Sequence, residues 1–414
     1  MGVKQKFEFE EKIFDNGLWL GYKRVDSPDI VMRVDVDQGR VYEEESKAGI
    51  THLLEHMLFK GATKNTTEIK EELEKLTGRE LSAEGDYDTL RFMFRMPRNN
   101  LESVIDLFFE MFTNKQIREE ELEKEKIIVG NEARLYYGSP FLDFLNGVRR
   151  KTYPNHPYGE LDCGTNETIN SISVQDLIKL EENGFVGSNT KIVVVGNFDP
   201  DKLIKKVDST FGRLKKGNPV VPISEVQPII PEEIEGSFEA QPYISLSIIF
   251  QIPGIKDKDR VVMDTIGWYL GRGANSRLFR VLREENQICY SFGIDRDVHS
   301  KYWKDHYSIF ASNFDTLKRS YVISMIKDEL DKLRQGEIDS EALKRVKHGW
   351  LLTFYEDEVE RLESQADNII KARSRGYSVN EVDYLVRNLT TKDLQRAAEK
   401  YFNDRYLVVT ITPK

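Results

Sequence analysis

The two halves of this 414-residue chain end in the same local pattern. Residues 173–185 read SVQDLIKLEENGF and residues 390–402 read TTKDLQRAAEKYF, and an apolar, strand-like run follows each of them. In both segments Asp-Leu opens a helical pattern that ends at a phenylalanine nine residues after the aspartate. Internal similarity of this kind indicates a tandem duplication. The chain is therefore expected to fold as two homologous domains.

A segment rich in proline and glycine separates the halves. Residues 211–232 contain four of the 13 prolines and little helical pattern, as expected for a linker. We predict a first domain over 1–215, a linker over 216–232 and a second domain over 233–414. Each half begins with strand-like sequence, at 31–36 and 244–253, and long helical stretches follow. That order favours the α+β class.

Composition excludes several classes of protein. The net charge is −10, which argues against nucleic-acid binding. No stretch approaches the roughly 20 apolar residues that span a bilayer, so no membrane partner is expected. The first residues are polar and lack the apolar segment of a secretory signal, which favours the cytoplasm. Cys163 and Cys289 are far apart in sequence and are expected to be reduced thiols.

Residues 52–56 read His-Leu-Leu-Glu-His. On a helix, two histidines four residues apart lie on one face, one turn above the other. Two neutral imidazoles at that spacing can bind one metal ion, and Glu55 lies close enough to act on a water molecule at the metal. The competing interpretation is a core helix with hydrogen-bonded histidines. It would bury three polar groups beside an apolar face, which is costly without partners.

The residues alone leave the third ligand open. A catalytic zinc usually has three protein ligands and one open position, and the other four histidines show no metal spacing. A carboxylate is therefore expected, but the chain has 70 acidic residues. The helical segment 119–134 contains Glu125 and Glu132 two turns apart on one face. Most acidic helix runs, however, are solvated faces.

The segment 49–61, GITHLLEHMLFKG, resembles the zinc helix of the pitrilysin family, which includes insulin-degrading enzymes and mitochondrial processing peptidases. Glu132 follows the second histidine by 76 residues and stands where that family has its third ligand. The resemblance implies one Zn²⁺ per chain held by His52, His56 and Glu132. It also implies Glu55 as general base, and Glu125 as a residue that orients the ligands.

A second motif lies in the other half. Residues 271–285, GRGANSRLFRVLREE, run into Cys289-Tyr290-Ser291, similar to the family's S-R-L-F…L-R-E…Y-S signature. The similarity implies that Arg283 and Tyr290 contact the substrate. Without it, they would be taken for a surface charge and a core aromatic.

The peptide-binding strand departs from the family pattern. Residues 78–83 read GRELSA where the family often has Gly-Gly-x-x-Asn-Ala. Ser82 and Ala83 are the expected substrate contacts, but Arg79 and Ser82 put the usual asparagine contact in doubt. The metal ligands are unaffected.

The resemblance implies a zinc metalloendopeptidase that cleaves peptides or small unfolded polypeptides inside a closed chamber. Each domain would be a mainly antiparallel sheet packed with helices, and the second would bind no metal. Two chains would form a homodimer in which Arg283 and Tyr290 act in trans. The alternatives are a non-catalytic scaffold or partner subunit, and a peptide-binding module with structural zinc. Structural zinc normally has four protein ligands, and no fourth candidate is visible.

Overall fold

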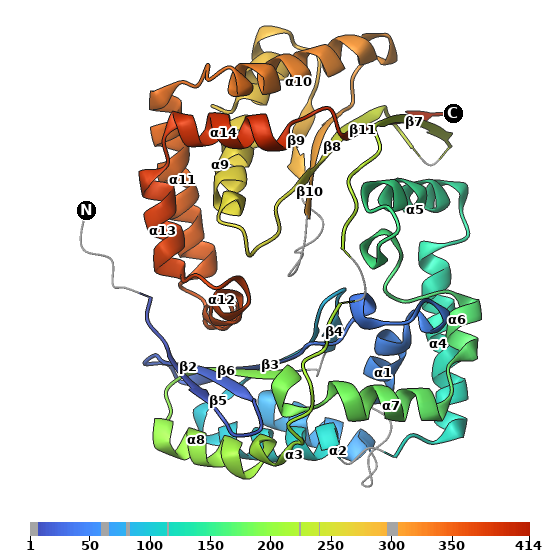
Figure 1. Ribbon diagram of the computed structural model, residues 1–414, viewed down its shortest axis with the longest axis vertical. Helices are drawn as coiled ribbons and strands as arrows, with labels where there is room; N and C mark the ends of the chain where they lie inside the picture. Colours follow the sequence, from blue (N-terminus) through green and yellow to red (C-terminus); the bar gives the residue numbers. More distant parts are fainter. Residues whose placement is uncertain are drawn as a thin grey trace. The chain divides into compact units, whose positions relative to one another are not determined.

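A computed structural model describes residues 7–58, 66–79, 83–113, 116–222, 225–239, 241–295 and 305–414 (Figure 1). Contacts divide the chain into two compact units. The first comprises residues 1–137, 160–224 and 358–371, and the second comprises 138–159, 225–357 and 372–414. Each unit contains one sheet and several helices, which confirms the predicted α+β class.

The sheet of the first unit has six strands in the order β1-β2-β6-β3-β5-β4. Strands β2 and β6 are parallel, and the other neighbours are antiparallel. The strands are β1 (Glu10–Ile13), β2 (Trp19–Arg24), β3 (Asp29–Val36), β4 (Ala83–Gly85), β5 (Leu90–Pro97) and β6 (Thr190–Gly196). The short strand β4 therefore ends the sheet.

Helices of the same unit cover one face of this sheet. Along β3 the apolar residues alternate, so that Ile30, Met32, Val34 and Val36 point into one hydrophobic core, as the period of two in a strand requires. The helices of this unit are α1 (Ile50–Leu58), α2 (Thr66–Thr77), α3 (Leu101–Thr113), α4 (Glu119–Tyr136), α6 (Asn166–Ser171), α7 (Val174–Gly184) and α8 (Pro200–Ser209).

The opposite face of the sheet is covered by a helix from the other end of the chain. Helix α12 (Leu362–Arg375) contributes Asp367, which pairs with buried Arg33 of β3, and Glu363, which pairs with Arg95 of β5 at 3.0 Å. Ile369 is fully buried, and its side chain approaches Gly21 of β2. Residues 358–371 thus belong structurally to the first unit.

The second unit repeats the topology of the first. Its sheet has the order β7-β11-β8-β10-β9, with β7 and β11 parallel and the other pairs antiparallel. This order matches β2-β6-β3-β5-β4 strand for strand. The strands are β7 (Glu232–Phe238), β8 (Ser245–Ile252), β9 (Ser291–Asp295), β10 (Asp305–Ser312) and β11 (Tyr406–Pro413).

Helices also cover both faces of the second sheet. One face packs on the core formed with α9, α10 and α14. The other packs on α5, where Val148 contacts a cluster that includes Ile249 and Leu407. The helices are α5 (Pro140–Thr152), α9 (Asp259–Gly271), α10 (Arg319–Arg334), α11 (Ser340–Glu358), α13 (Val379–Asn388) and α14 (Thr391–Tyr401). A π-helical segment spans Phe279–Glu285.

The two similar segments noted in the sequence adopt the same local structure. Helix α7 begins with a capping box between Ser173 and Asp176, and α14 begins with one between Thr390 and Asp393. Each helix ends at the corresponding phenylalanine, Phe185 or Phe402, with nearly equal backbone angles. A reciprocal cap satisfies two otherwise unpaired N–H groups, so the Ser/Thr-x-x-Asp pattern explains where both helices start.

The units differ from the predicted sequence domains in two segments. The prediction placed the boundary between residues 215 and 233, with one domain on each side. In the structure, residues 138–159 belong to the second unit and residues 358–371 to the first. Among the described residues, no helix is both long enough and apolar enough to cross a membrane.

Candidate metal centre

Helix α1 carries the His-x-x-Glu-His motif on its polar face. Its apolar residues are buried in the core of the first unit: Ile50, Leu53, Leu54, Met57 and Leu58. His52, Glu55 and His56 are each half-buried. The apolar spacing of three and four residues fixes the rotation of the helix, and this rotation turns both imidazoles toward α4.

Helix α4 brings the carboxylates. Leu122 and Val129 anchor it in the same core, and Glu125 and Glu132 project from the adjoining face. Glu125 is only 2% exposed, whereas Glu132 is half-buried. The strongly helical acidic segment of the sequence is therefore packed on one side, and two of its glutamates face α1.

The three predicted ligands converge. Glu132 Oε2 lies 3.4 Å from His52 Nε2 and 3.6 Å from His56 Nε2. The two imidazole centroids are 4.9 Å apart, and one donor atom from each of the three residues lies within 4.8 Å of the others. Among the described residues this is the one group of three or more side chains able to hold a metal ion.

The donor set fits zinc. Ligand atoms about 2.0–2.2 Å from one tetrahedral zinc ion lie about 3.3–3.6 Å from one another, which matches the two histidine–glutamate separations. His52 Nε2 is buried and has no hydrogen-bond partner among the described residues. A buried polar atom without a partner is costly. A metal ion at this point would satisfy it.

Glu125 lies behind the second histidine. Its Oε2 is 3.1 Å from His56 Nδ1. With the proton on Nδ1, this nitrogen donates to the carboxylate and leaves the Nε2 lone pair directed at the candidate metal position. Glu125 is the residue for which the family resemblance implies an orienting role, and that role stays a prediction.

Glu55 is held by the edge strand β4. Its Oε2 accepts a hydrogen bond from the Gly85 backbone N–H at 3.0 Å. A Cβ atom at position 85 would lie 2.9 Å from the same oxygen. A side chain at position 85 would therefore require the Glu55 carboxylate to shift from its present position.

The electrostatics of the site favour neutral groups. Burial, with smaller contributions from the carboxylates of Glu132, Asp162 and Glu84, raises the pKa of Glu55 to about 7, although the hydrogen bond from Gly85 lowers it. Burial lowers the pKa of His52, and the neighbouring His56 adds to this effect. A neutral imidazole is the form that binds a metal ion. A bound cation would favour the ionised form of Glu55.

We expect the Glu55→Gln protein to be more stable than wild type in the zinc-free state at pH 8. The folded-state pKa of about 7 exceeds the ordinary 4.5, so wild type loses stability as the pH rises from 4.5 through 7. The gain at pH 8 is on the order of 3 kcal/mol, and it vanishes below pH 4.5. Urea unfolding of both zinc-free proteins measures it, with the exposed Glu102→Gln of α3 as control. An equal gain in the free energy of unfolding at pH 8 and below pH 4.5 would contradict the prediction.

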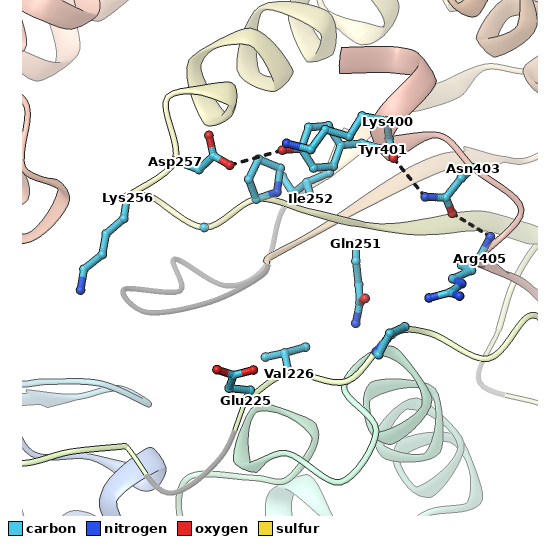
Figure 2. Close-up of a pocket in the computed structure, with 13 residues that line it drawn as sticks. Glu225, Val226, Gln251, Ile252, Lys256, Asp257, Lys400, Tyr401, Asn403 and Arg405 are labelled. Atoms are coloured by element: carbon cyan, nitrogen blue, oxygen red, sulfur yellow. Dashed lines mark hydrogen bonds between the residues drawn. The ribbon is translucent and has the colours of Figure 1, made fainter. Parts of the chain in front are cut away.

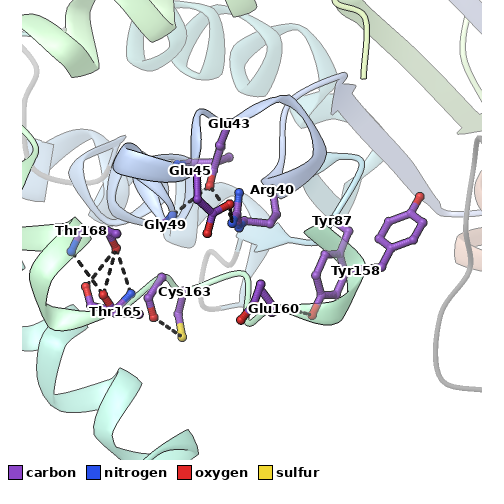
Figure 3. A network of polar contacts seen from close by, with 12 residues as sticks. Arg40, Glu43, Glu45, Gly49, Tyr87, Tyr158, Glu160, Cys163, Thr165 and Thr168 are labelled. Carbon is purple, nitrogen blue, oxygen red and sulfur yellow. Dashed lines mark hydrogen bonds and ion pairs between the residues drawn. The ribbon is translucent and has the colours of Figure 1, made fainter. Parts of the chain in front are cut away.

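Two residues near the site were not found from the sequence. Glu43, in the loop before α1, accepts hydrogen bonds from the backbone N–H groups of Gly49 and Thr51 (Figure 3). Asp162 raises the pKa of both His52 and Glu55 through its charge. No motif or spacing rule connects either residue with the histidines, because loops bring them there.

The predicted substrate residues lie in both units. Ser82 lies outside the described residues, and Ala83 begins β4, half-buried opposite Phe92. In the second unit the Arg283 guanidinium lies over the Tyr290 ring, 4.6 Å from its centroid. Tyr290 is 68% exposed. It is therefore not the core aromatic residue that it would be taken for without the family resemblance. Arg283 stands on the π-helical segment, a feature often found at functional sites.

A pocket of about 580 Å³ is lined by residues of the second unit (Figure 2). Two of its lining residues, Lys400 and Tyr401, are engaged with one carboxylate. Lys400 Nζ and the Tyr401 hydroxyl both contact Asp259 Oδ2 at 3.0 Å. The helix that corresponds to α1, α9, contains no histidine, so it does not repeat the His-x-x-Glu-His motif.

Several proteins of similar sequence are named zinc proteases. An uncharacterized zinc protease of Rickettsia felis is 24% identical over 97% of this chain and 96% of its own length. The zinc protease PqqE of Helicobacter pylori is 24% identical over 95% of this chain and 90% of its own. A crystal structure of a protease from Helicobacter pylori superposes with a TM-score of 0.85 at 20% identity, covering 98% of this chain and 99% of that one.

A peptidase M16 inactive domain from Pseudomonas fluorescens superposes equally well, with a TM-score of 0.85 at 16% identity over 98% of both chains. Two family models match separate parts of the sequence. Residues 26–159 match insulinase (peptidase family M16), and residues 171–349 match the peptidase M16 inactive domain. The first match contains the whole candidate metal centre, and the second contains Arg283 and Tyr290. The chain therefore belongs to the insulinase family, peptidase family M16.

Proposed function

We propose that this chain is a zinc-dependent endopeptidase that hydrolyses peptides or small unfolded polypeptides. The observation that carries the proposal is the convergence of His52, His56 and Glu132 on one point, with the Glu55 carboxylate beside them. Two imidazoles and one carboxylate that leave a position open are a catalytic donor set for zinc. Family membership and the names of the relatives support the same activity.

Each residue has a distinct task. When bound, zinc would act as a Lewis acid and lower the pKa of a water molecule to about 7. Glu55 takes a proton from the attacking water and later gives it to the leaving amine. The Gly85 N–H holds Oε2 of Glu55 and so orients the carboxylate for both transfers. Glu125 keeps His56 in the tautomer whose Nε2 faces the metal.

The peptide would bind as an added strand. Strand β4 ends the first sheet, and an extended chain can pair with the free side of an edge strand. Ala83 and its sequence neighbour Ser82 are the proposed contacts there. The stacked Arg283 and Tyr290 would hold the substrate backbone and stabilise the developing oxyanion. Arg283 has donors in a planar fork suited to carbonyl and carboxylate oxygens.

We further propose that two chains close around the substrate as a homodimer, with Arg283 and Tyr290 serving the zinc site of the other chain. The cytoplasmic location expected from the sequence stays a prediction alongside this one.

Mixing two inactive variants tests the dimer. Glu55→Gln lacks the base and Arg283→Ala lacks the substrate contact. A heterodimer with in-trans sites has one complete site, so random exchange at equal amounts should recover about a quarter of wild-type activity. Peptide cleavage after co-refolding measures it, and mass spectrometry confirms the exchange. Confirmed heterodimers without activity would refute the in-trans arrangement.

Zinc content and cleavage together test the function. The purified protein should contain one zinc ion per chain and cut members of an unstructured peptide library. A chelator should stop cleavage and added zinc should restore it. Bound zinc without cleavage of any peptide would favour the non-catalytic partner subunit instead. Cleavage that persists after complete removal of the metal would exclude the proposed chemistry.

A further inference from the structure

The N-terminus of helix α1 is capped by a carboxylate from the preceding loop. Glu43 Oε2 accepts from Gly49 N at 2.8 Å, and Oε1 accepts from Thr51 N at 2.9 Å. Both carboxylate oxygens are thus used on amide groups at the start of the helix. A negative charge at this end is also favoured by the helix dipole.

This carboxylate is deeply buried and paired. Glu43 is 3% exposed and Arg40 is 1% exposed. Arg40 Nε lies 4.0 Å from Glu43 Oε2, and Arg40 Nη2 donates to the exposed Glu45 at 2.7 Å (Figure 3). Arg40 Nε and Nη1 are buried without a hydrogen-bond partner among the described residues. Burying such a pair is unfavourable unless good geometry and further hydrogen bonds offset the cost of removing both charges from water.

The first turn of α1 has little freedom on its other side. Gly49 has φ +87°, and a Cβ atom there would lie 2.4 Å from the Cys163 carbonyl oxygen. The turn is therefore held between the loop at Cys163 and the carboxylate of Glu43. His52 follows Thr51 directly, so any rotation of this turn would displace its imidazole. Metal sites tolerate only about 0.2 Å of error in ligand distance.

We propose that Glu43, balanced by Arg40, is a positioning residue that fixes the first turn of α1 and thereby the direction of the His52 imidazole. The inference rests on the proposed function in taking His52 as a zinc ligand. It goes beyond that function because neither residue contacts the metal or the substrate.

The test is Glu43→Gln. Glutamine keeps the volume and one acceptor oxygen, but its amide NH₂ would face one of the two backbone N–H groups. The dissociation constant for zinc, measured by competition with a chelator, should rise about 10–100-fold, as for other changes that misorient ligands. At saturating zinc, kcat should fall while KM stays unchanged. In the zinc-free protein the amide hydrogens of Gly49 and Thr51 should exchange faster.

A matched control is Asp199→Ala. Asp199 caps α8 in the same unit by accepting from Asp201 N and Lys202 N. Its loss should lower thermal stability without changing zinc affinity or exchange at Gly49 and Thr51. Arg40→Lys keeps the charge but not the guanidinium geometry, and should show a smaller change in the same direction. If the Glu43→Gln protein fails to fold, the Arg40→Lys protein takes its place in the measurements of zinc affinity and amide exchange.

Wild-type zinc affinity and wild-type exchange in the folded variant would overturn the proposal. If the unaltered protein binds no zinc, the proposed function fails separately. In that case amide exchange in the Glu43→Gln protein alone tests the positioning role of Glu43. Unchanged exchange of the Thr51 amide would reject that role.

Discussion

Replacing Glu55 with glutamine is expected to remove nearly all peptidase turnover while the protein keeps one zinc ion per chain. A positioned general base contributes about 10²–10⁴-fold to the rate, so kcat should fall by that factor. Zinc content should not change, because Glu55 is not among the three converging donors. Glutamine preserves the shape and an oxygen that can accept from Gly85 N, so the edge strand should stay in place.

The exposed Glu102→Gln, on α3 of the same unit, is the matched control and should have wild-type kcat. Turnover and metal content are measured on the same preparations, the second by atomic absorption. A folded Glu55→Gln protein with wild-type kcat would remove Glu55 from the mechanism. A protein that lost its zinc would instead show that Glu55 helps to hold the metal.

Three glutamates on helix α4 should respond very differently to the same substitution. Glu132→Gln removes a ligand and should weaken zinc binding by more than about 100-fold. Glu125→Gln disturbs only the orientation of His56 and should weaken zinc binding by about 10–100-fold. Glu123→Gln should leave zinc binding unchanged, because Glu123 pairs with Lys126 at 2.7 Å and with no other described residue, and its side chain is 58% exposed.

Chelator competition ranks the three proteins, and kcat/KM should follow the same order. The series controls for the loss of a negative charge on α4, since every member loses one. Equal losses of zinc affinity on substitution of Glu132 and Glu123 would show that Glu132 is not a ligand. A larger loss for Glu125→Gln than for Glu132→Gln would make Glu125 the ligand and Glu132 the orienting residue.

The local parts of the site could be predicted from the sequence. Spacing of four residues places His52 and His56 on one helical face whatever the rest of the chain does. Spacing of seven does the same for Glu125 and Glu132. The repeated Asp-Leu segments likewise predicted two equal helix–strand units, and both helices carry the same capping box.

The remaining features depend on loops and on packing between distant segments. Gly85 approaches Glu55 because β4 pairs with β5 next to α1. Glu43 reaches the start of α1 across a loop with no recognisable pattern. The roles of Ser82 and Ala83 stay predictions, and Ser82 lies outside the described residues.

The sequence by itself indicated two candidate metal ligands on one helical face and a division into two similar halves, because residue type and periodic spacing act locally. Residue type and spacing alone left open which of the 70 acidic residues meets the histidines, although the family resemblance implied Glu132; in the structure Glu132 lies there because α4 packs against α1. Only the tertiary structure decided that α5 and α12 each cover the sheet of the other half. A sheet has two faces to bury, and no local pattern in the sequence states which helix will cover the second.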